Sequence, residues 1–120
     1  MDKIEIPFRL PSLNQYINEC RKNRFAGGKM KKTVDSDIAY YINQLPKYDR
    51  PIKIHFTWVE ENKRRDLDNV CFAKKFVLDS MVKAGKLKDD NRNYVVGFED
   101  KFKYDKESKV ILEVEEIWVI

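Results

Sequence analysis

Alternating apolar and polar residues predict strands at the two ends of the chain and in its middle. The alternation runs over Lys3–Phe8 and, most clearly, over Pro51–Val59, where every second residue is a large apolar one. Two further strands are predicted over Tyr94–Phe98 and Lys109–Val119, and the polar run Lys103–Ser108 is expected to be the turn between them. Successive side chains of a strand point to opposite faces, so this period of two predicts four half-buried strands.

Three segments instead carry apolar residues at helical spacing. The first follows Ser12 or Asn14, either of which can cap its N-terminus, and the second covers Ser36–Leu45. The third and longest runs over Asn69–Ala84 and ends at Gly85, which suits the position after a helix C-terminus.

The expected order of elements is therefore βααβαββ. We interpret it as an α+β fold, a single domain over residues 1–120, with a four-stranded mixed sheet and helices packed on it. No internal repeat or low-complexity tract divides the chain, and a chain of this length buries enough surface for one modest core.

Composition narrows the class of protein without defining a function. Hydrophobic residues make up 42% and charged residues 37% of the 120, and the formal net charge of +4 is weak support for a polyanionic partner. Cys20 and Cys71 lack the spacing of a disulfide or metal motif, which suits a reducing cytoplasm. The N-terminus alternates rather than resembling a signal peptide, and no apolar run could cross a bilayer. We expect a cytoplasmic protein without a membrane partner.

Two carboxylates separated by one residue, Asp66 and Asp68, are the first candidate for chemistry. In an extended segment their side chains point to the same side, and such a pair is costly unless a cation neutralises it. Mg²⁺ is bound in this way, by one or two carboxylates together with water and substrate phosphate oxygens. A simpler alternative stays open, in which Asp68 or Asn69 only caps the following helix.

A second acidic pair, Asp89 and Asp90, follows that helix. Asp90 can meet Asp66 and Asp68 only if the following strand returns alongside the helix or alongside the segment that carries Asp66. A βαβ-like unit permits such a return. Lys75 falls on the same helical stripe as Asp68 and Asp79, where it could face a phosphate or offset the carboxylates. The alternatives are a solvated turn for the acidic pair and a solvated helix face for the lysine.

Other chemistries are excluded by the residues themselves. His55 is the only histidine and has no partner for a nucleophilic triad, and the two cysteines cannot complete a zinc site. The Asp66–Asp68 segment lacks the glycine and glutamate that an EF-hand needs, and Gly27-Gly28-Lys29 lacks the spacing of a P-loop.

Several motifs together resemble one known family. Arg65-Asp66-Leu67-Asp68-Asn69, a helix, Lys83-Ala84-Gly85 and then Asp89-Asp90 are similar to the RusA family of Holliday-junction resolvases. Leu10-Pro11-Ser12-Leu13-Asn14 resembles the Pro-Ser-x-Asn segment near the N-terminus of that family. Chain length and element order agree as well, so the resemblance covers nearly the whole chain.

The resemblance implies a homodimeric endonuclease of DNA recombination and repair, with a prophage origin plausible. It would bind four-way junction DNA and nick two opposed strands. The reaction would need Mg²⁺, for which Mn²⁺ can substitute, and no organic cofactor. The essential carboxylates carry over to Asp66, Asp68 and Asp90, with Asp89 as a neighbouring metal ligand, and the catalytic lysine to Lys75. The stretch from Asn69 to Asp79 is longer than in some members by about one helical turn, which leaves Lys74 as the alternative lysine.

The basic residues would then hold DNA phosphates. Many lie in the segment 21–32, which has six basic residues, no acidic one and a Gly-Gly pair, and is expected to be an exposed loop. The candidate DNA contacts are Arg21, Lys22, Arg24, Lys29, Lys31, Lys32, Lys63, Arg64, Arg65 and Lys74. Solubilising charge is the alternative for each. Two rival functions also stay open: a non-catalytic protein that binds junctions or single strands, and a metal-dependent ribonuclease.

Overall fold

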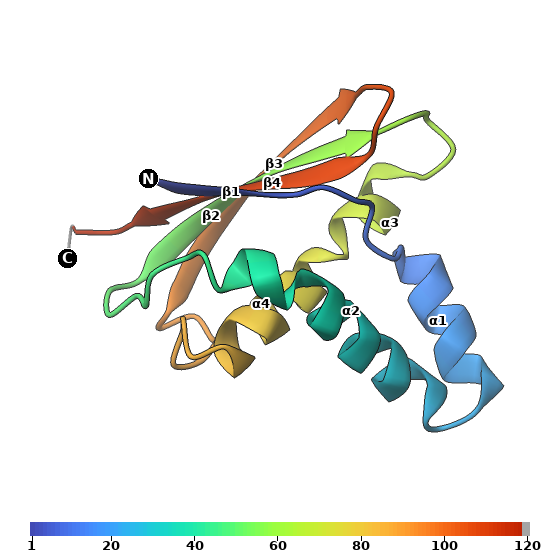
Figure 1. Cartoon of the computed structure of the whole chain (residues 1–120), viewed down its shortest axis with the longest axis horizontal. Coiled ribbons are helices and arrows are strands. Elements are labelled where there is room, and N and C mark those ends of the chain that lie inside the picture. The colour runs from blue at the N-terminus through green and yellow to red at the C-terminus, as the bar shows by residue number, and fades with distance from the viewer. Residues whose placement is uncertain (119–120) are drawn as a thin grey trace.

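A four-stranded mixed sheet carries the helices on one of its faces in a computed structural model that describes residues 1–118 (Figure 1). This confirms the predicted α+β class and a single domain. The elements in chain order are β1 (Asp2–Ile6), α1 (Leu13–Lys22), α2 (Ala26–Ile42), β2 (Ile52–Glu60), α3 (Leu67–Cys71), α4 (Lys74–Lys83), β3 (Val95–Tyr104) and β4 (Lys109–Glu116).

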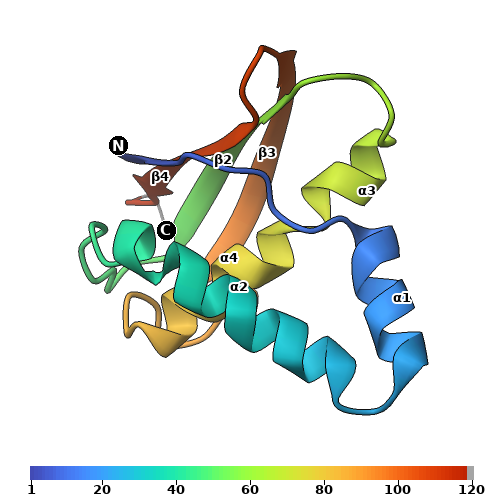
Figure 2. The same cartoon turned by 45° about the vertical axis from the view of Figure 1, so that its right-hand side comes forward.

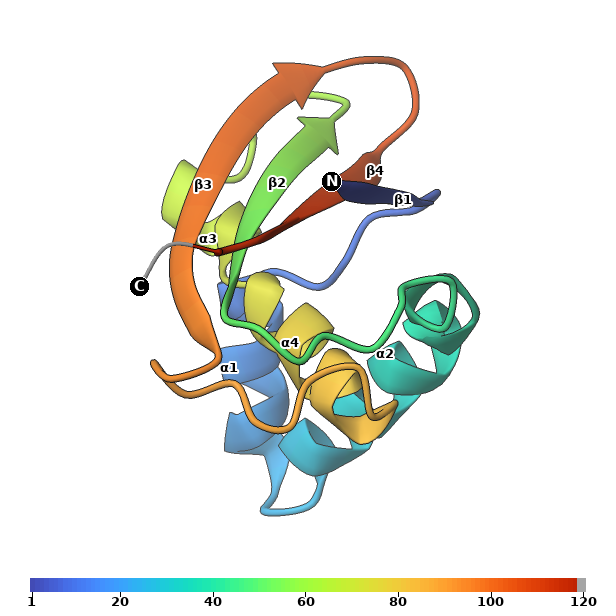
Figure 3. The ribbon, with the colours of Figure 1, turned by 90° about the vertical axis from the view of Figure 1, so that its left-hand side faces the viewer.

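The strands lie in the order β1-β4-β2-β3, with β1 and β3 at the edges (Figure 3). β4 is antiparallel to both of its neighbours, whereas β2 and β3 are parallel. A parallel pair needs a crossover connection, and here the crossover contains α3 and α4. The chain therefore forms a βαβ-like unit, in which α3 and α4 carry it from the carboxyl end of β2 back to the amino end of β3.

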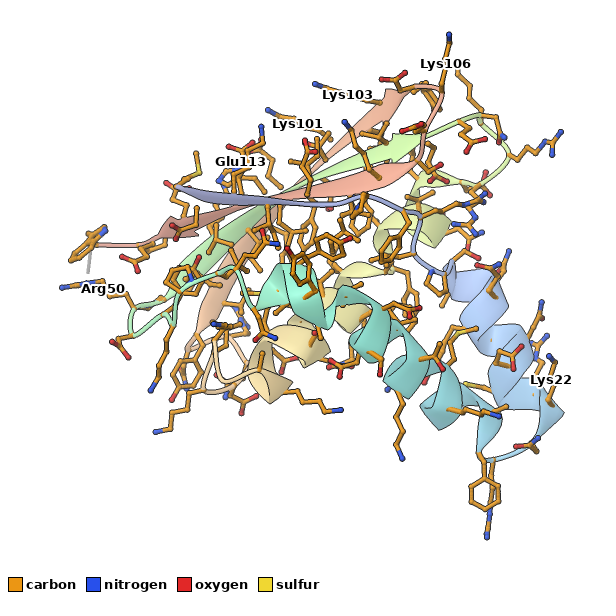
Figure 4. All side chains as sticks on the ribbon, in the orientation of Figure 1. Lys22, Arg50, Lys101, Lys103, Lys106 and Glu113 are labelled. Atoms are coloured by element: carbon orange, nitrogen blue, oxygen red, sulfur yellow. The ribbon has the colours of Figure 1, made fainter. Side chains whose placement is uncertain are left out.

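The two faces of the sheet differ in character. The helix-bearing face holds the core, in which Ile6, Ile54, Phe56 and Leu112 are fully buried. The other face carries charged side chains, and Figure 4 shows Lys101, Lys103 and Glu113 projecting from it, away from the helices. No helix within residues 1–118 is long and apolar enough to cross a membrane.

The first helix begins where the sequence predicts. Of the two candidate caps, Ser12 is the N-cap, and its hydroxyl accepts a hydrogen bond from the backbone N–H of Gln15. The Gln15 side chain in turn accepts from the backbone N–H of Ser12, which completes a capping box.

The prediction of an exposed loop over residues 21–32 is wrong for most of its length. Only residues 23–25 separate α1 from α2, and the two helices form an antiparallel pair whose connection lies far from the sheet (Figure 2). α2 therefore starts ten residues before the predicted Ser36. The Gly-Gly pair does not break the helix, because Gly27 is where α2 approaches α1. A Cβ atom on Gly27 would lie 2.6 Å from the Sγ atom of Cys20.

The helix predicted over Asn69–Ala84 is in fact two helices, so the observed order has one more helix than expected. Around Phe72 the backbone switches to tighter bonds three residues apart, such as Ala73 N–H to Val70 O at 3.2 Å and Lys75 N–H to Phe72 O at 3.0 Å. The rings of Tyr16 and Phe72 stack at 5.6 Å, and this contact holds the bend against α1. The predicted end at Gly85 is confirmed, since this residue has a φ of 74°.

The last two strands differ from prediction in length. β3 runs to Tyr104 rather than Phe98, because charged residues interrupt the apolar pattern on an edge strand that pairs on one side only. β4 ends at Glu116, and Val119, the predicted end, lies outside the described residues. β1 ends at Ile6, two residues before Phe8.

Candidate metal and DNA site

The acidic segment lies between the end of β2 and the first turn of α3. Asp66 is the N-cap residue of α3, with extended backbone (φ −65°, ψ 154°), and its side chain makes no capping hydrogen bond. Asp68 is already helical, so the extended geometry assumed for the pair is wrong and the two carboxylates are not related by strand alternation. Both residues are exposed, and within residues 1–118 neither carboxylate has a hydrogen bond or an ion pair.

The residues that flank these acids are both anchored to the start of α1. Arg65 donates to the backbone oxygen of Leu10 at 3.1 Å and to Oε1 of Gln15 at 2.8 Å. Asn69 accepts the backbone N–H of Asn14 at 2.9 Å, so its side chain serves α1 and does not cap its own helix. Two of the motifs that carry the family resemblance are therefore joined, and these contacts fix the acidic segment at both ends.

Arg65 is a structural residue in this arrangement. Only 13% of its side chain is exposed. Burial, and then the charge of Arg9, lower the pKa of Arg65, whereas Glu60 opposes the shift. Its guanidinium donates to Leu10 and Gln15, and a contact between this arginine and a DNA phosphate stays a prediction.

Lys75 connects α4 to the second acidic pair. Its Nζ atom lies 3.1 Å from Oδ1 of Asp79, one turn further along the helix, and 3.8 Å from Oδ2 of Asp90. The hydrogen bond to Asp79 is the main cause that raises the pKa of Lys75, and both carboxylate charges add to it. The predicted stripe of Lys75 and Asp79 is thus present, and Asp90 returns alongside it.

The structure does not gather all the predicted metal ligands. Asp66 and Asp68 follow the carboxyl end of β2, whereas Asp89 and Asp90 precede the amino end of β3, so they start from opposite ends of a parallel strand pair. The carboxylate of Asp89 accepts the Asp90 N–H and the Asn91 amide within its own turn. In the part of the chain that is described, no three His, Cys, Asp or Glu side chains are grouped to hold a metal.

Lys74 and Asp100 form a pair that the sequence analysis missed. Nζ of Lys74 lies 2.6 Å from Oδ2 of Asp100, and the other carboxylate oxygen accepts the indole N–H of the buried Trp58 at 2.9 Å. Lys74 was considered as the alternative lysine and as a DNA contact, and only 19% of its side chain is exposed. The sequence contained a sign of this pair. Asp100 alternates with Phe98 and Phe102, which puts its side chain on the face of β3 that the helices cover. There it can accept the hydrogen bond that the buried indole of Trp58 needs to donate.

A groove of about 630 Å³ lies beside Asp68 and the two candidate lysines. Asp68 from α3 and Lys74 and Lys75 from α4 line it, and Lys31 joins them from α2. The groove therefore brings one predicted metal ligand to both candidate lysines. Its remaining walls are largely apolar.

The other basic residues differ in how freely they are presented. Arg21, Lys32 and Arg64 are exposed, and Lys22 is paired with Glu19 at 2.7 Å. Three have cations over aromatic rings: Arg24 over Phe25, Lys31 over Tyr16 and Lys63 over Tyr104. Lys22 and Lys29 line a larger cleft of about 1020 Å³ between α1 and α2.

No protein-family model matches this sequence, and no curated protein matches it significantly. The similarity to the RusA family therefore rests on the motif residues alone, and the family assignment stays a prediction.

Proposed function

We propose that the protein is a Mg²⁺-dependent endonuclease that acts as a homodimer and resolves four-way DNA junctions in the manner of the RusA family. One observation carries the proposal. Asp66 and Asp68 are exposed and have no partner within residues 1–118, yet the residues on either side of them are hydrogen-bonded to the start of α1. Unpaired acids on an anchored segment are expected of a metal site, because ligands must be held in place before the metal binds.

The two carboxylates suit Mg²⁺. This ion takes oxygen ligands, and one or two carboxylates with water and substrate phosphates are sufficient to hold it. Asp66 and Asp68 would supply them, and when bound the metal would neutralise the phosphodiester and lower the pKa of an attacking water. Asp90 is the third carboxylate of the proposal, with Asp89 as its neighbour; it lies 3.8 Å from the Lys75 ammonium and does not line the groove.

Lys75 has the role of a fixed positive charge. Its ammonium is held by Asp79 and Asp90, and the raised pKa keeps it protonated at neutral pH. A protonated lysine beside a bound phosphodiester stabilises the negative charge that develops during cleavage. Basic residues such as Lys29 and Lys32 on α2 and Lys63 after β2 would bind the flanking phosphates. Two copies related by a twofold axis would present two such sites to opposed strands.

One observation favours the rival function of a non-catalytic junction or single-strand binder. Asp79 and Asp90 already share the ammonium of Lys75, and no three-ligand group is present in residues 1–118. The rival function, however, gives Asp66 and Asp68 no role, because acidic residues beside a phosphate-binding surface weaken DNA binding.

The test is to incubate the protein with a mobile synthetic four-way junction in Mg²⁺, in Mn²⁺ and in EDTA. We expect paired symmetric nicks in either metal and none in EDTA. Cleavage that persists in EDTA would refute the metal-dependent mechanism. Tight junction binding without cleavage in any metal would favour the rival.

A further inference from the structure

The groove beside Asp68 has an aromatic wall that the metal chemistry does not use. Tyr16 from α1 and Phe72 from the bend between α3 and α4 stack with ring centroids 5.6 Å apart. Phe98 from the edge strand β3 also lines the groove, and 44% of it is exposed. Three elements that are distant in sequence therefore present planar rings to one hollow, next to the proposed site.

The charges around this wall are mainly positive. Lys31, Lys74 and Lys75 line the groove, and Asp68 is the one acidic lining residue among the described positions. Lys74 lies 4.7 Å from the ring centroid of Phe98 and is also bound to Asp100, so it is held in the wall. Lys31, which lies over the Tyr16 ring, and Lys75, whose ammonium is held by Asp79 and Asp90, complete the positive side of the groove. An apolar wall with cations beside it is complementary to a molecule that has a flat ring and a phosphate.

We propose that this groove binds an unpaired nucleotide of a DNA strand, with its base against Phe98 and the Tyr16–Phe72 wall and its phosphate against Lys31 and Lys75. The choice of DNA rests on the proposed function. Base stacking on aromatic side chains is a general means of holding single strands, because every base has a flat face. A base held here would place its adjacent backbone beside Asp68, so the groove would select strands that are unpaired next to the cleaved bond.

The experiment compares two strands of equal charge. One is a fluorescent oligothymidylate, and the other has the same length and phosphates but only abasic residues. Binding is measured by anisotropy in EDTA, so that cleavage plays no part. We expect the full-length wild-type chain to bind the oligothymidylate about fivefold or more tightly than the abasic strand, as the loss of base stacking implies.

Two variants locate the effect. Phe98→Leu keeps an apolar residue but removes the ring, and it should abolish the preference for the oligothymidylate. Tyr40→Leu is the matched control, because Tyr40 is an aromatic residue on α2 that is 73% exposed and does not line the groove. Lys31→Ala should weaken binding of both strands, since it removes a proposed phosphate contact; it also removes the cation over the Tyr16 ring, so the loss of preference is assigned from Phe98→Leu.

Equal affinities of the wild type for both strands, or no binding of either, would overturn the proposal. A Phe98→Leu variant that keeps the full preference for the oligothymidylate would also overturn it. A Phe98→Leu variant that changes only the oligomeric state would overturn it as well, because that result is expected if a second copy of the chain fills the groove. Failure of the proposed function is a separate result. It would appear as absent junction cleavage in Mg²⁺ by a protein that still distinguishes the two strands.

Discussion

The ammonium of Lys74 lies 2.6 Å from the carboxylate of Asp100, and both side chains are less than one quarter exposed. Asp100 is bound a second time by the indole of Trp58. This relationship links α4, which carries the candidate lysines, to the edge strand β3. It also removes one of the two candidate lysines from the solvent.

Breaking this pair should cost stability. Lys74→Ala leaves a partly buried carboxylate without its cation, and we expect the free energy of unfolding to fall by about 1–3 kcal/mol. Lys22→Ala is the control, because it breaks an exposed pair with Glu19 and should cost less than about 0.5 kcal/mol. Urea denaturation of the three proteins measures both effects. Equal losses in the two variants would contradict a structural role for Lys74.

The sequence predicted the class of fold because the sheet has one buried face. Alternation in β2 and β4 and the cap at Ser12 are local signals, and these elements appear close to where they were expected. The errors arise where tertiary contacts override local patterns. Gly27 was taken as part of a loop but permits close helix packing, and Phe72 lies at a bend that its ring contact with Tyr16 holds in place.

The candidate site was predictable only as a set of residue types. Asp66 and Asp68 were identified by spacing, and Lys75 by its position relative to Asp79. Their separation from Asp90 depends on the parallel pairing of β2 and β3, and the burial of Arg65 depends on Leu10 and Gln15. Neither relationship is encoded within a short stretch of sequence.

The anchor at Asn69 gives a second prediction. Asn69→Ala removes the acceptor for the Asn14 N–H, and we expect it to cost about 1 kcal/mol of stability and to slow junction cleavage. Metal-free junction binding should stay the same, because no phosphate contact is lost. Asn18→Ala, at an exposed position of α1, is the control and should change neither property. An Asn69→Ala protein with wild-type cleavage would show that the anchor does not serve the site.

The two neighbouring glycines of α2 give a third prediction. A Cβ atom at Gly28 meets nothing within 4 Å, so Gly28→Ala should stabilise the protein by up to about 1 kcal/mol through helix propensity. At Gly27 the same change meets the thiol of Cys20, and we expect a net loss of about 1 kcal/mol. Thermal unfolding compares the two. Adding Cys20→Ala to the Gly27 variant should recover the loss, and no recovery would refute the contact.

The protonation state of Lys75 gives a fourth prediction. Its pKa is raised, so the stabilising charge is fully present below the ordinary lysine value and is lost only as pH rises through the folded pKa. Lys75 therefore stays charged between about pH 6 and pH 9 and cannot act as a general base there. Lys75→Ala should lower the cleavage rate by the same factor across this range, and Lys75→Arg should keep much of the rate. An inflection in the wild-type pH–rate profile that disappears in both variants would assign Lys75 a proton-transfer role.

Asp68→Asn tests the central claim most directly, because it preserves the shape of an exposed and unpaired side chain while removing its charge. The measurement is the junction cleavage rate in Mg²⁺, made beside the junction affinity in EDTA. If Asp68 is a metal ligand, the rate should fall about 100-fold or more, while metal-free affinity holds or rises as repulsion of the phosphates decreases. Asp66→Asn and Asp90→Asn should behave alike. An Asp68→Asn protein that cleaves junctions at the wild-type rate would contradict the assignment of this segment as the catalytic metal site.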